Sequence, residues 1–294
     1  MSITCVDTRA QRSARRIEQL YSTDAQFAAA RLSTTVGIAI SKCGLGLRQI
    51  IQTVMDGYPQ RPALGQRATR VVTDPNTGRS SAQLLAEFET ITYRELWNRT
   101  NALTNAFAAE ALADRGQRVC VLGFASIDYA TIDLALTLLG AVSVPLPTNA
   151  ARAQLCHIVS ETQPSLIASS TENLPDAISL VLSHRAPHRV VVFDYRLELD
   201  AHREALEAAR ARLAAIPVTV ETLTAIIARG RTVRPAEADC GAQSADAPAL
   251  LIYTSGSTGH PRASSTPATG WRTSGVPRKP RSNRPNNQGS GVVD

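Results

Sequence analysis

The sequence predicts an α/β fold with a mostly parallel sheet, and three observations support this prediction. Short apolar runs rich in β-branched residues alternate with longer helical patterns through the middle of the chain. The runs are apolar at nearly every position, which is typical of strands buried on both faces of a parallel sheet. The segments between them are long enough for crossover helices, so consecutive strands can form βαβ units with helices on both faces.

The N-terminal part of the chain is predicted to be helical. Residues 1–40 are polar and alanine-rich, with a helical pattern around Ile17 and Leu20, and are expected to form an N-terminal helical extension. The segment "LRQIIQTVMDG" predicts an amphipathic helix that ends at Gly57, with prolines beyond it. Another helix is predicted to begin after Thr92, because Thr92 can cap it while Glu95 reaches back to complete a capping box.

Strands and helices are predicted to alternate from residue 118 onward. The predicted strands span 118–123, 141–146, 165–169, 189–195 and 249–253. The predicted helices span 126–140, 150–161, 176–184, 200–216 and 220–229. From about Ala263 the periodicity disappears. Residues 263–294 are therefore expected to form a disordered basic tail, since they bury too little apolar surface to offset the entropy of ordering.

The charge distribution argues against a nucleic-acid-binding body. The formal net charge is +6, but from Arg262 onward six basic residues face one acid, so six minus one, or five, of these charges lie in the last part of the chain. The remainder is nearly neutral and has no basic field of its own. No apolar run is long and uninterrupted enough for a membrane span or a secretory signal, so a cytoplasmic protein is expected.

The cysteines give no sign of a disulfide framework. All five are scattered along the chain, without a C-x-x-C pair, and are expected to be reduced thiols. Cys156 and His157 are neighbours on a predicted helix and therefore point in different directions, so a catalytic thiol–imidazole pair is not expected.

The isolated histidines and aspartates also favour structural roles. His184, His188 and His202 lack metal-ligand spacing and are expected at the surface. Asp128 and Asp133 are expected in the first turn and on the solvent side of one helix, and not as a catalytic dyad.

One loop carries a stronger chemical signal. The segment "YTSGSTGHPR" directly follows the predicted strand 249–253 and combines glycines, hydroxyl residues and a basic residue. Glycines allow the main chain to approach a ligand closely, and successive N–H groups form an anion-binding concavity. Ser and Thr hydroxyls add donors, and the arginine adds a cation for phosphate. The spacing excludes a G-x-x-x-x-G-K-[ST] loop, and a Gly/Ser/Thr run in isolation is also typical of a flexible linker.

The loop resembles the phosphate-binding signature of the adenylate-forming, or AMP-binding, superfamily. The segments "RPALGQR", "FETITYRELW", "GAVSVPL" and "VVFDY" resemble the N-terminal part of the adenylation domain of mycobacterial carboxylic acid reductases, which are also named fatty-acid–CoA ligases. The resemblance runs from about Glu18 to Arg262 and implies a partial AMP-binding domain over residues 41–262. It assigns the ATP phosphates to Thr254, Ser255, Gly256, Ser257, Thr258, Gly259 and Arg262.

The resemblance implies an acid-activating reaction. A carboxylic or fatty acid attacks the α-phosphate of ATP, assisted by Mg²⁺, and gives an acyl-adenylate and pyrophosphate. In the reductases a phosphopantetheine thiol then takes the acyl group and NADPH reduces it to an aldehyde, whereas in the ligases coenzyme A takes it. No catalytic residue or metal ligand is assigned to this chain by the resemblance.

The chain departs from the family after Arg262. Ala263 stands where the family has glycine, and the family's adenine, ribose, hinge, lysine, carrier and reductase segments have no counterpart. One codon spelling of "ASSTP", read one base earlier, restores the glycine, so we hypothesise a frameshift that leaves a truncated, inactive and poorly soluble fragment. The alternatives are a fatty-acid–CoA ligase fragment, or a non-enzymatic protein whose basic tail binds nucleic acid, although no nucleic-acid partner is expected.

Overall fold

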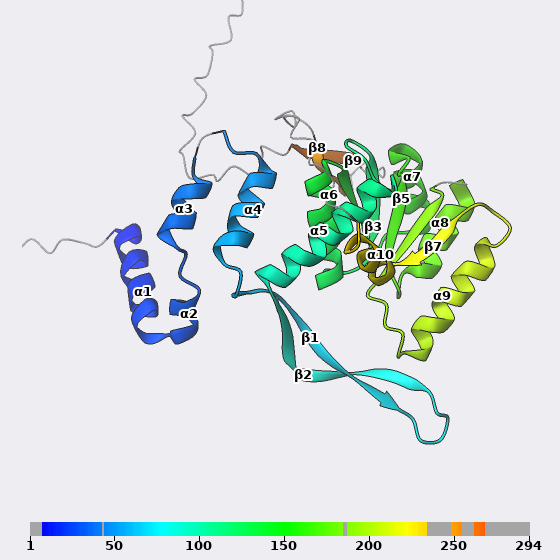
Figure 1. Cartoon of the computed structure of the whole chain (residues 1–294), viewed down its shortest axis with the longest axis horizontal. Helices are drawn as coiled ribbons and strands as arrows, with labels where there is room; N and C mark the ends of the chain where they lie inside the picture. The colour runs from blue at the N-terminus through cyan, green and yellow to red at the C-terminus, as the bar shows by residue number, and fades with distance from the viewer. Residues whose placement is uncertain (1–7, 43, 185–186, 234–247, 255–261, 268–294) are drawn as a thin grey trace, which may run out of the picture.

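The α/β fold class is confirmed by the structure, a computed structural model that describes residues 8–42, 44–184, 187–233, 248–254 and 262–267. A seven-stranded sheet has the order β7-β6-β5-β3-β4-β8-β9 (Figure 1). Its strands are β3 (Arg118–Leu122), β4 (Val142–Leu146), β5 (Leu166–Ser170), β6 (Arg189–Phe193), β7 (Thr219–Thr222), β8 (Pro248–Thr254) and β9 (Arg262–Pro267). Every neighbouring pair is parallel except β8 and β9. Strands β3 to β7 therefore follow the order of a doubly wound sheet.

The sheet is covered by helices on both faces (Figure 1). The helices on one face are α5 (Tyr93–Ala109), α6 (Ile127–Leu139) and α10 (Leu223–Gly230). Those on the other face are α7 (Arg152–Thr162), α8 (Leu174–His184) and α9 (Asp200–Leu213). Alternate residues of β3 supply the two cores, with Val119 in one and Cys120 in the other. The uniformly apolar strands of the sequence are thus explained by burial from both sides.

The predicted helix ends are confirmed at two places. Thr92 Oγ1 accepts a hydrogen bond from the Glu95 N–H at 3.2 Å, and Glu95 Oε2 accepts one from the Thr92 N–H at 2.7 Å, which completes the capping box of α5. Ser126 caps α6 by accepting a hydrogen bond from the Tyr129 N–H, and α6 ends at Gly140 in a left-handed conformation.

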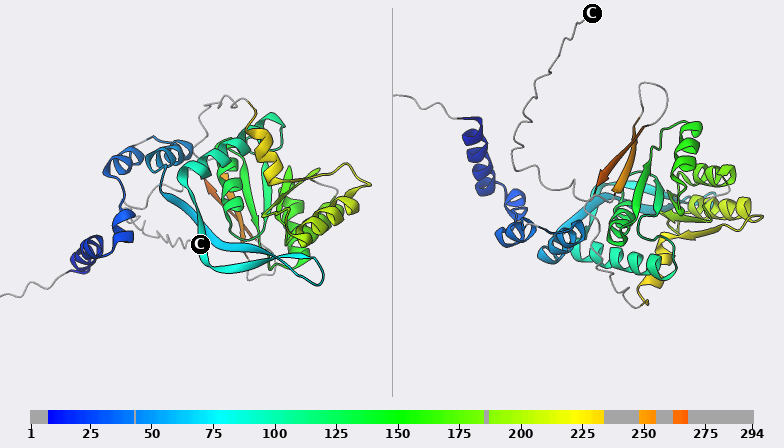
Figure 2. Two further views of the ribbon diagram at one scale, coloured as in Figure 1. Left: turned by 60° about the horizontal axis from the view of Figure 1, so that its bottom comes forward. Right: turned by 90° about the horizontal axis from the view of Figure 1, so that it is seen from above.

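The described part of the N-terminal extension is helical, as expected. Its helices are α1 (Arg9–Thr23), α2 (Ala25–Ala29) and α3 (Thr34–Ile40), and α4 (Leu47–Gly57) follows it in the next segment of the chain. The end of α4 at Gly57 agrees with the prediction. Helix α1 buries none of its residues, and α1 and α2 stand apart from the sheet in Figures 1 and 2. No helix among the described residues is long and apolar enough to cross a membrane.

A long β-hairpin before α5 was not predicted. Strands β1 (Pro62–Thr73) and β2 (Ser80–Thr92) pair antiparallel as a separate two-stranded sheet that projects from the body in Figure 1. Their turn is closed by the Asp74 N–H, which donates to the Arg79 carbonyl, with Gly78 at φ +68°. The signal for this hairpin is the turn sequence "DPNTG" between "RVVT" and "RSSAQLL".

Two predicted boundaries were wrong. The helix expected from Val220 begins at Leu223, because Val220 lies in β7 and pairs with Val190 of β6. Residues 263–267, expected to begin the disordered tail, instead belong to β9, which pairs antiparallel with β8. Strand pairing uses main-chain N–H and C=O groups, so a Ser/Thr-rich segment can join a sheet edge without apolar side chains. The rest of the tail lies outside the described residues.

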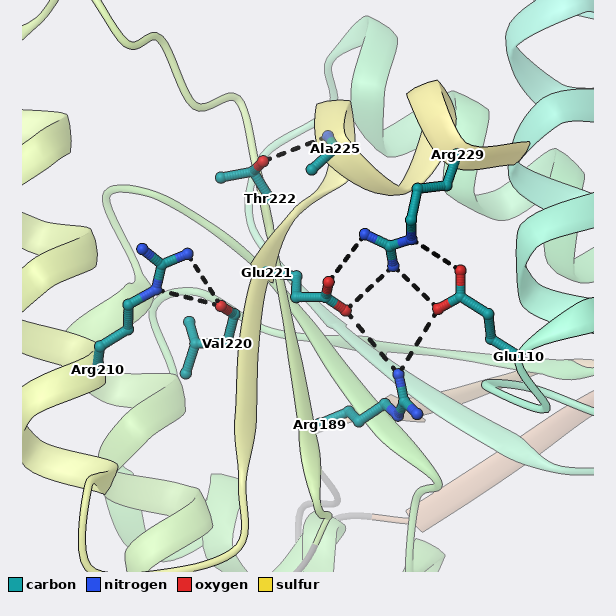
Figure 3. Close-up of polar contacts among 8 residues, drawn as sticks. All are labelled: Glu110, Arg189, Arg210, Val220, Glu221, Thr222, Ala225 and Arg229. Atoms are coloured by element: carbon teal, nitrogen blue, oxygen red, sulfur yellow. Dashed lines mark hydrogen bonds and ion pairs between the residues drawn. The ribbon is translucent and has the colours of Figure 1, made fainter. Parts of the chain in front are cut away.

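An ion-pair network ties α10 to α5 and to one margin of the sheet. Arg229 points between Glu110 and Glu221 (Figure 3). Its guanidinium donates to Glu110 twice, at 2.9 Å each, and to Glu221 at 2.9 and 3.3 Å. Arg189 lies 3.9 Å from both carboxylates. The two arginines offset the repulsion between these carboxylates. The pKa of Glu110 is lowered chiefly by its hydrogen bonds from Arg229.

Candidate phosphate-binding edge of the sheet

Strand β8 delivers the predicted loop to the carboxyl edge of the sheet. It runs parallel to β4, with Leu250 opposite Ser143. Its last residue, Thr254, therefore lies at the same edge as the carboxyl ends of β3 to β6. Ligands of open α/β sheets bind in the crevice outside this edge.

Strand β9 brings the two ends of the loop together. Arg262 is paired with Thr254, and Ala263 with Tyr253, in the antiparallel register of β8 and β9. Figure 2 shows this pair of strands at one margin of the sheet. The other predicted phosphate-binding residues, which lie between these two ends, are outside the described residues: Ser255, Gly256, Ser257, Thr258 and Gly259.

Tyr253 fixes the strand just before the loop. Its side chain is buried in the core beneath α7, together with Cys120 and Leu146. Burial, with the nearby Glu161 carboxylate, raises the pKa of Tyr253 to about 12. The phenol therefore stays neutral at physiological pH, and its role is to anchor the end of β8.

A second group of polar residues lies at the same edge, beyond β6. Asp194 has φ +53°, a left-handed conformation that is uncommon for residues other than glycine. Its N–H donates to Asp128 Oδ2 at 3.0 Å, and Asp128 also pairs with Arg99. Burial raises the pKa of Asp194 to about 6, and the Asp128 and Glu172 carboxylates add to this effect. Asp128 lies in the first turn of α6 as expected, and it also links the main chain at Asp194 to the side chain of Arg99.

The expectation that Asp133 faces solvent was wrong. Ser143 Oγ, in buried strand β4, donates to Asp133 Oδ1 at 2.6 Å, and burial raises the pKa of this carboxyl. Helix α6 lies over β4, so the hydroxyl of Ser143 is within reach of the helix face that carries Asp133. Asp128 and Asp133 hold different partners on different sides of α6.

The histidines take separate structural positions. His188 is exposed as expected, but His202 is half-buried: its Nδ1 accepts a hydrogen bond from the Arg196 N–H at 3.0 Å, and burial lowers its pKa. His157 lies 3.7 Å from Glu161 on the same helix. His184 is also partly buried, against the surface expectation. Within the described ranges, no three His, Cys, Asp or Glu side chains are grouped closely enough to hold a metal ion.

The free thiols differ in accessibility. Cys120 is fully buried, and burial raises its pKa to about 12, whereas Cys156 is partly exposed. Cys5, Cys43 and Cys240 lie outside the described residues. Cys120 Sγ lies 3.7 Å from Thr162 Oγ1 inside the core beneath α7.

Comparison with known proteins identifies the family of this chain. The sequence profile of the family described as AMP-binding enzyme matches residues 54–264, most of the chain, and includes the whole loop from Thr254 to Arg262. The chain belongs to the AMP-binding enzyme family. Within that family it is 56% identical over 253 residues to a carboxylic acid reductase of Mycobacterium tuberculosis (strain ATCC 25618 / H37Rv), covering 86% of this chain and 21% of that protein. It is 52% identical over 272 residues to the carboxylic acid reductase of Mycobacterium marinum, covering 90% and 23%.

Solved structures of AMP-binding enzymes agree with this assignment. The adenylation domain of a carboxylate reductase from Mycobacterium chelonae is 42% identical, with a TM-score of 0.82 over 90% of this chain and 41% of that one. The adenylation domain of the carboxylic acid reductase from Segniliparus rugosus, in complex with AMP and a co-purified carboxylic acid, is 41% identical with a TM-score of 0.80. This chain thus spans about a fifth of the length of the curated relatives it matches.

Proposed function

We propose that residues 41–262 form part of an acid-activating adenylation domain of the carboxylic acid reductase type. In this proposal the segment from Thr254 to Arg262 holds the phosphates of ATP. The observation that supports it is the β8–β9 register, which sets Thr254 beside Arg262 at the carboxyl edge, inside the segment matched by the family. Main-chain N–H groups, Ser and Thr hydroxyls and the Arg262 cation suit a triphosphate.

The proposed reaction is the transfer of AMP to a carboxylate. The carboxylate oxygen of a carboxylic or fatty acid forms a bond to the α-phosphorus of ATP, and pyrophosphate leaves. The loop contributes by orienting the phosphates and stabilising charge that moves toward pyrophosphate. Mg²⁺ arriving with ATP would neutralise phosphate charge, and no described residue is assigned to it. Later steps with a phosphopantetheine or coenzyme A thiol, or with NADPH, are not assigned to this chain.

We further propose that this chain binds ATP but does not complete acyl-adenylate formation unaided. It aligns with 41% of a solved adenylation domain, and in this proposal groups that hold the acid and the nucleoside lie outside the aligned part. Phosphate binding needs only the loop, whereas catalysis needs the acid held against the α-phosphate. The two activities are therefore expected to separate in this chain.

ATP binding by loop variants tests the proposal. Isothermal titration of the full chain with ATP is compared with the Arg262→Ala variant and with a matched control, Arg272→Ala, which removes an arginine of the tail. We expect ~10-fold weaker binding for Arg262→Ala, because hydrogen bonds to charged groups contribute ~1.5–3 kcal/mol. The control should bind as the wild type. Equal loss of ATP affinity in both variants would show that the general charge of the tail binds ATP. If the full chain showed no saturable ATP binding, the proposal would be refuted.

Pyrophosphate release tests the second half of the proposal. The chain is incubated with ATP, Mg²⁺ and a series of carboxylic acids of different chain length. We expect no acid-dependent pyrophosphate above the protein-free rate. Acid-dependent release at a steady rate would show that the chain is a complete adenylating unit.

A further inference from the structure

We infer that helix α1 binds the surface of an anionic lipid bilayer and attaches the chain to it reversibly. This helix belongs to the N-terminal arm, defined here as residues 8–42, which also contains α2 and α3. The inference goes beyond the proposed function and does not depend on it.

Helix α1 carries its basic and its apolar side chains on different sides. Arg9, Arg12 and Arg16 are spaced by three and four residues, which places them on one face of an α-helix. A second set with the same kind of spacing occupies another face: Ala10, Ala14, Ile17 and Tyr21. A helix that is polar overall, with arginines on one side and apolar residues on the other, is typical of helices that lie in the interface of a bilayer.

Helix α1 is exposed along its length. It buries none of its residues, and it stands apart from the sheet in Figures 1 and 2. Near its end the Tyr21 ring packs against the Phe27 ring of α2, with 4.8 Å between their centroids, and the Arg31 guanidinium lies 4.7 Å from the centre of the Tyr21 ring. These contacts hold α1 against α2, while Ile17, one turn before Tyr21, remains 46% exposed.

The charge of the chain is unevenly distributed. The arm has six basic residues and two acidic ones, a net charge of +4, whereas residues 43–261 have 19 basic and 21 acidic ones, a net charge of −2. Four of the six basic residues of the arm lie in α1, against one acid, Glu18. An anionic surface therefore attracts the arm and repels the part of the chain that carries the sheet.

The arm repeats this combination of apolar and basic side chains after α2. Leu32 and Ile38 are 74% and 63% exposed, and they line one open hollow together with Lys42. Single exposed leucines are ordinary, but large apolar side chains that share one hollow mark an interaction surface. Two segments of the arm thus combine exposed apolar side chains with basic ones, as contact with a bilayer surface requires.

The apolar side chains favour a lipid surface over a nucleic acid, since both attract arginines. A bilayer has charged headgroups next to hydrocarbon, so arginine side chains can extend to the headgroups while Ile17 enters the apolar layer. A single-stranded nucleic acid is bound by aromatic rings that stack on its bases. The Tyr21 ring already contacts Phe27 and Arg31, and a nucleic acid has no apolar layer for Ile17.

Co-sedimentation with vesicles tests the inference. The full chain is mixed with phosphatidylcholine vesicles that either contain phosphatidylglycerol or lack it, at low and at high salt. The arm variant is Arg9→Gln with Arg16→Gln, and the apolar variant is Ile17→Gln. The matched control, Arg67→Gln with Arg70→Gln, removes the same charge from two exposed arginines of β1. All four proteins keep the basic tail, so its charges are common to every comparison.

We expect the wild type to bind only the vesicles that contain phosphatidylglycerol, and to bind them less tightly at high salt. One arginine near such a surface strengthens binding about fivefold, so the arm variant should bind ~25-fold more weakly. The apolar variant should lose ~5-fold, because it no longer buries the exposed half of Ile17. The control should bind as the wild type. Hydrogen exchange of α1 should slow when the anionic vesicles are present.

Three results would overturn the inference. Equal loss in the arm variant and the control would mean that overall charge drives binding. Bound chain with unchanged exchange in α1 would mean that the basic tail holds the vesicles. Tighter binding to duplex DNA than to the anionic vesicles, lost in the arm variant and unaffected by Ile17→Gln, would make α1 a nucleic-acid contact.

Discussion

Replacement of Asp194 by asparagine should stabilise the chain at neutral pH and change how its stability depends on pH. Asp194 is half-buried beyond β6, where the Asp128 and Glu172 carboxylates also oppose its ionisation. Asparagine removes the charge, keeps an oxygen that can accept the hydrogen bond from Ser126, and tolerates the left-handed backbone. The substitution therefore isolates the cost of ionising this carboxyl.

The sign and size follow from the pKa of Asp194. It rises from an ordinary 3.8 to about 6 on folding, so the folded chain holds the proton more tightly than the unfolded chain. The favourable contribution is fully present below about pH 4 and is lost as pH rises through about 6. A gap of about two pH units corresponds to ~3 kcal/mol, and residual solvent contact reduces this to ~2 kcal/mol. The advantage of Asp194→Asn over the wild type should grow by that amount between pH 4 and pH 8.

Urea unfolding at pH 4, 5, 6, 7 and 8, followed by circular dichroism, measures this difference. Other titrating groups are common to both proteins and cancel in the comparison. Asp194→Ala is the matched control: it also removes the charge, but alanine at φ +53° adds a pH-independent cost of ~1–2 kcal/mol. The reasoning is refuted if wild type and Asp194→Asn give parallel curves over this range.

Three further predictions test the packing. A Cβ on Gly230 would lie 1.8 Å from a main-chain oxygen of α5, so Gly230→Ala should lower the free energy of unfolding by ~2 kcal/mol or more. Gly37 in α3 has open space around it, so Gly37→Ala should raise the free energy of unfolding by ~0.5–1 kcal/mol in the same urea assay. In the native chain a thiol reagent should label Cys156 before buried Cys120, as peptide mass mapping would show, and the reverse order would contradict the burial of Cys120. Arg229→Met should cost ~1–2 kcal/mol at low salt, because Glu110 and Glu221 lose the arginine that hydrogen-bonds to both and keep only the more distant Arg189. An unchanged unfolding midpoint would mean that the network is energetically neutral.

The sequence predicted those parts of the fold that depend on neighbouring residues. The capping box of Thr92 and Glu95 and the end of α6 at Gly140 involve residues three to four positions apart, so a short pattern contains the whole interaction. The apolar strands were predicted because burial on both faces leaves no position for polar residues. Sheet membership of β9 was missed because pairing with β8 depends on main-chain geometry that a Ser/Thr-rich pattern does not encode.

The carboxyl-edge groups show where sequence patterns fail. Arg99, Asp128 and Asp194 come from α5, α6 and the end of β6, and only the fold brings them together. The solvent-side expectation for Asp133 failed for the same reason, since Ser143 lies ten residues away on a different element. The phosphate loop was predicted from its glycine and hydroxyl spacing and the family resemblance, while the contacts of its side chains remain a prediction.

The main-chain N–H groups at the carboxyl edge support the proposal that phosphate binds after β8. An anion site needs main-chain N–H groups that have no other acceptor. At the ends of the other strands these groups are engaged: the Ile127 N–H by Gln66, the Asp194 N–H by Asp128, and the Thr171 N–H by the Phe193 carbonyl. These three N–H groups are therefore not free to bind an anion. The acidic residues beside Asp194 would also repel an anion, which agrees with the proposal that the phosphates of ATP bind after Thr254, where Arg262 supplies a cation.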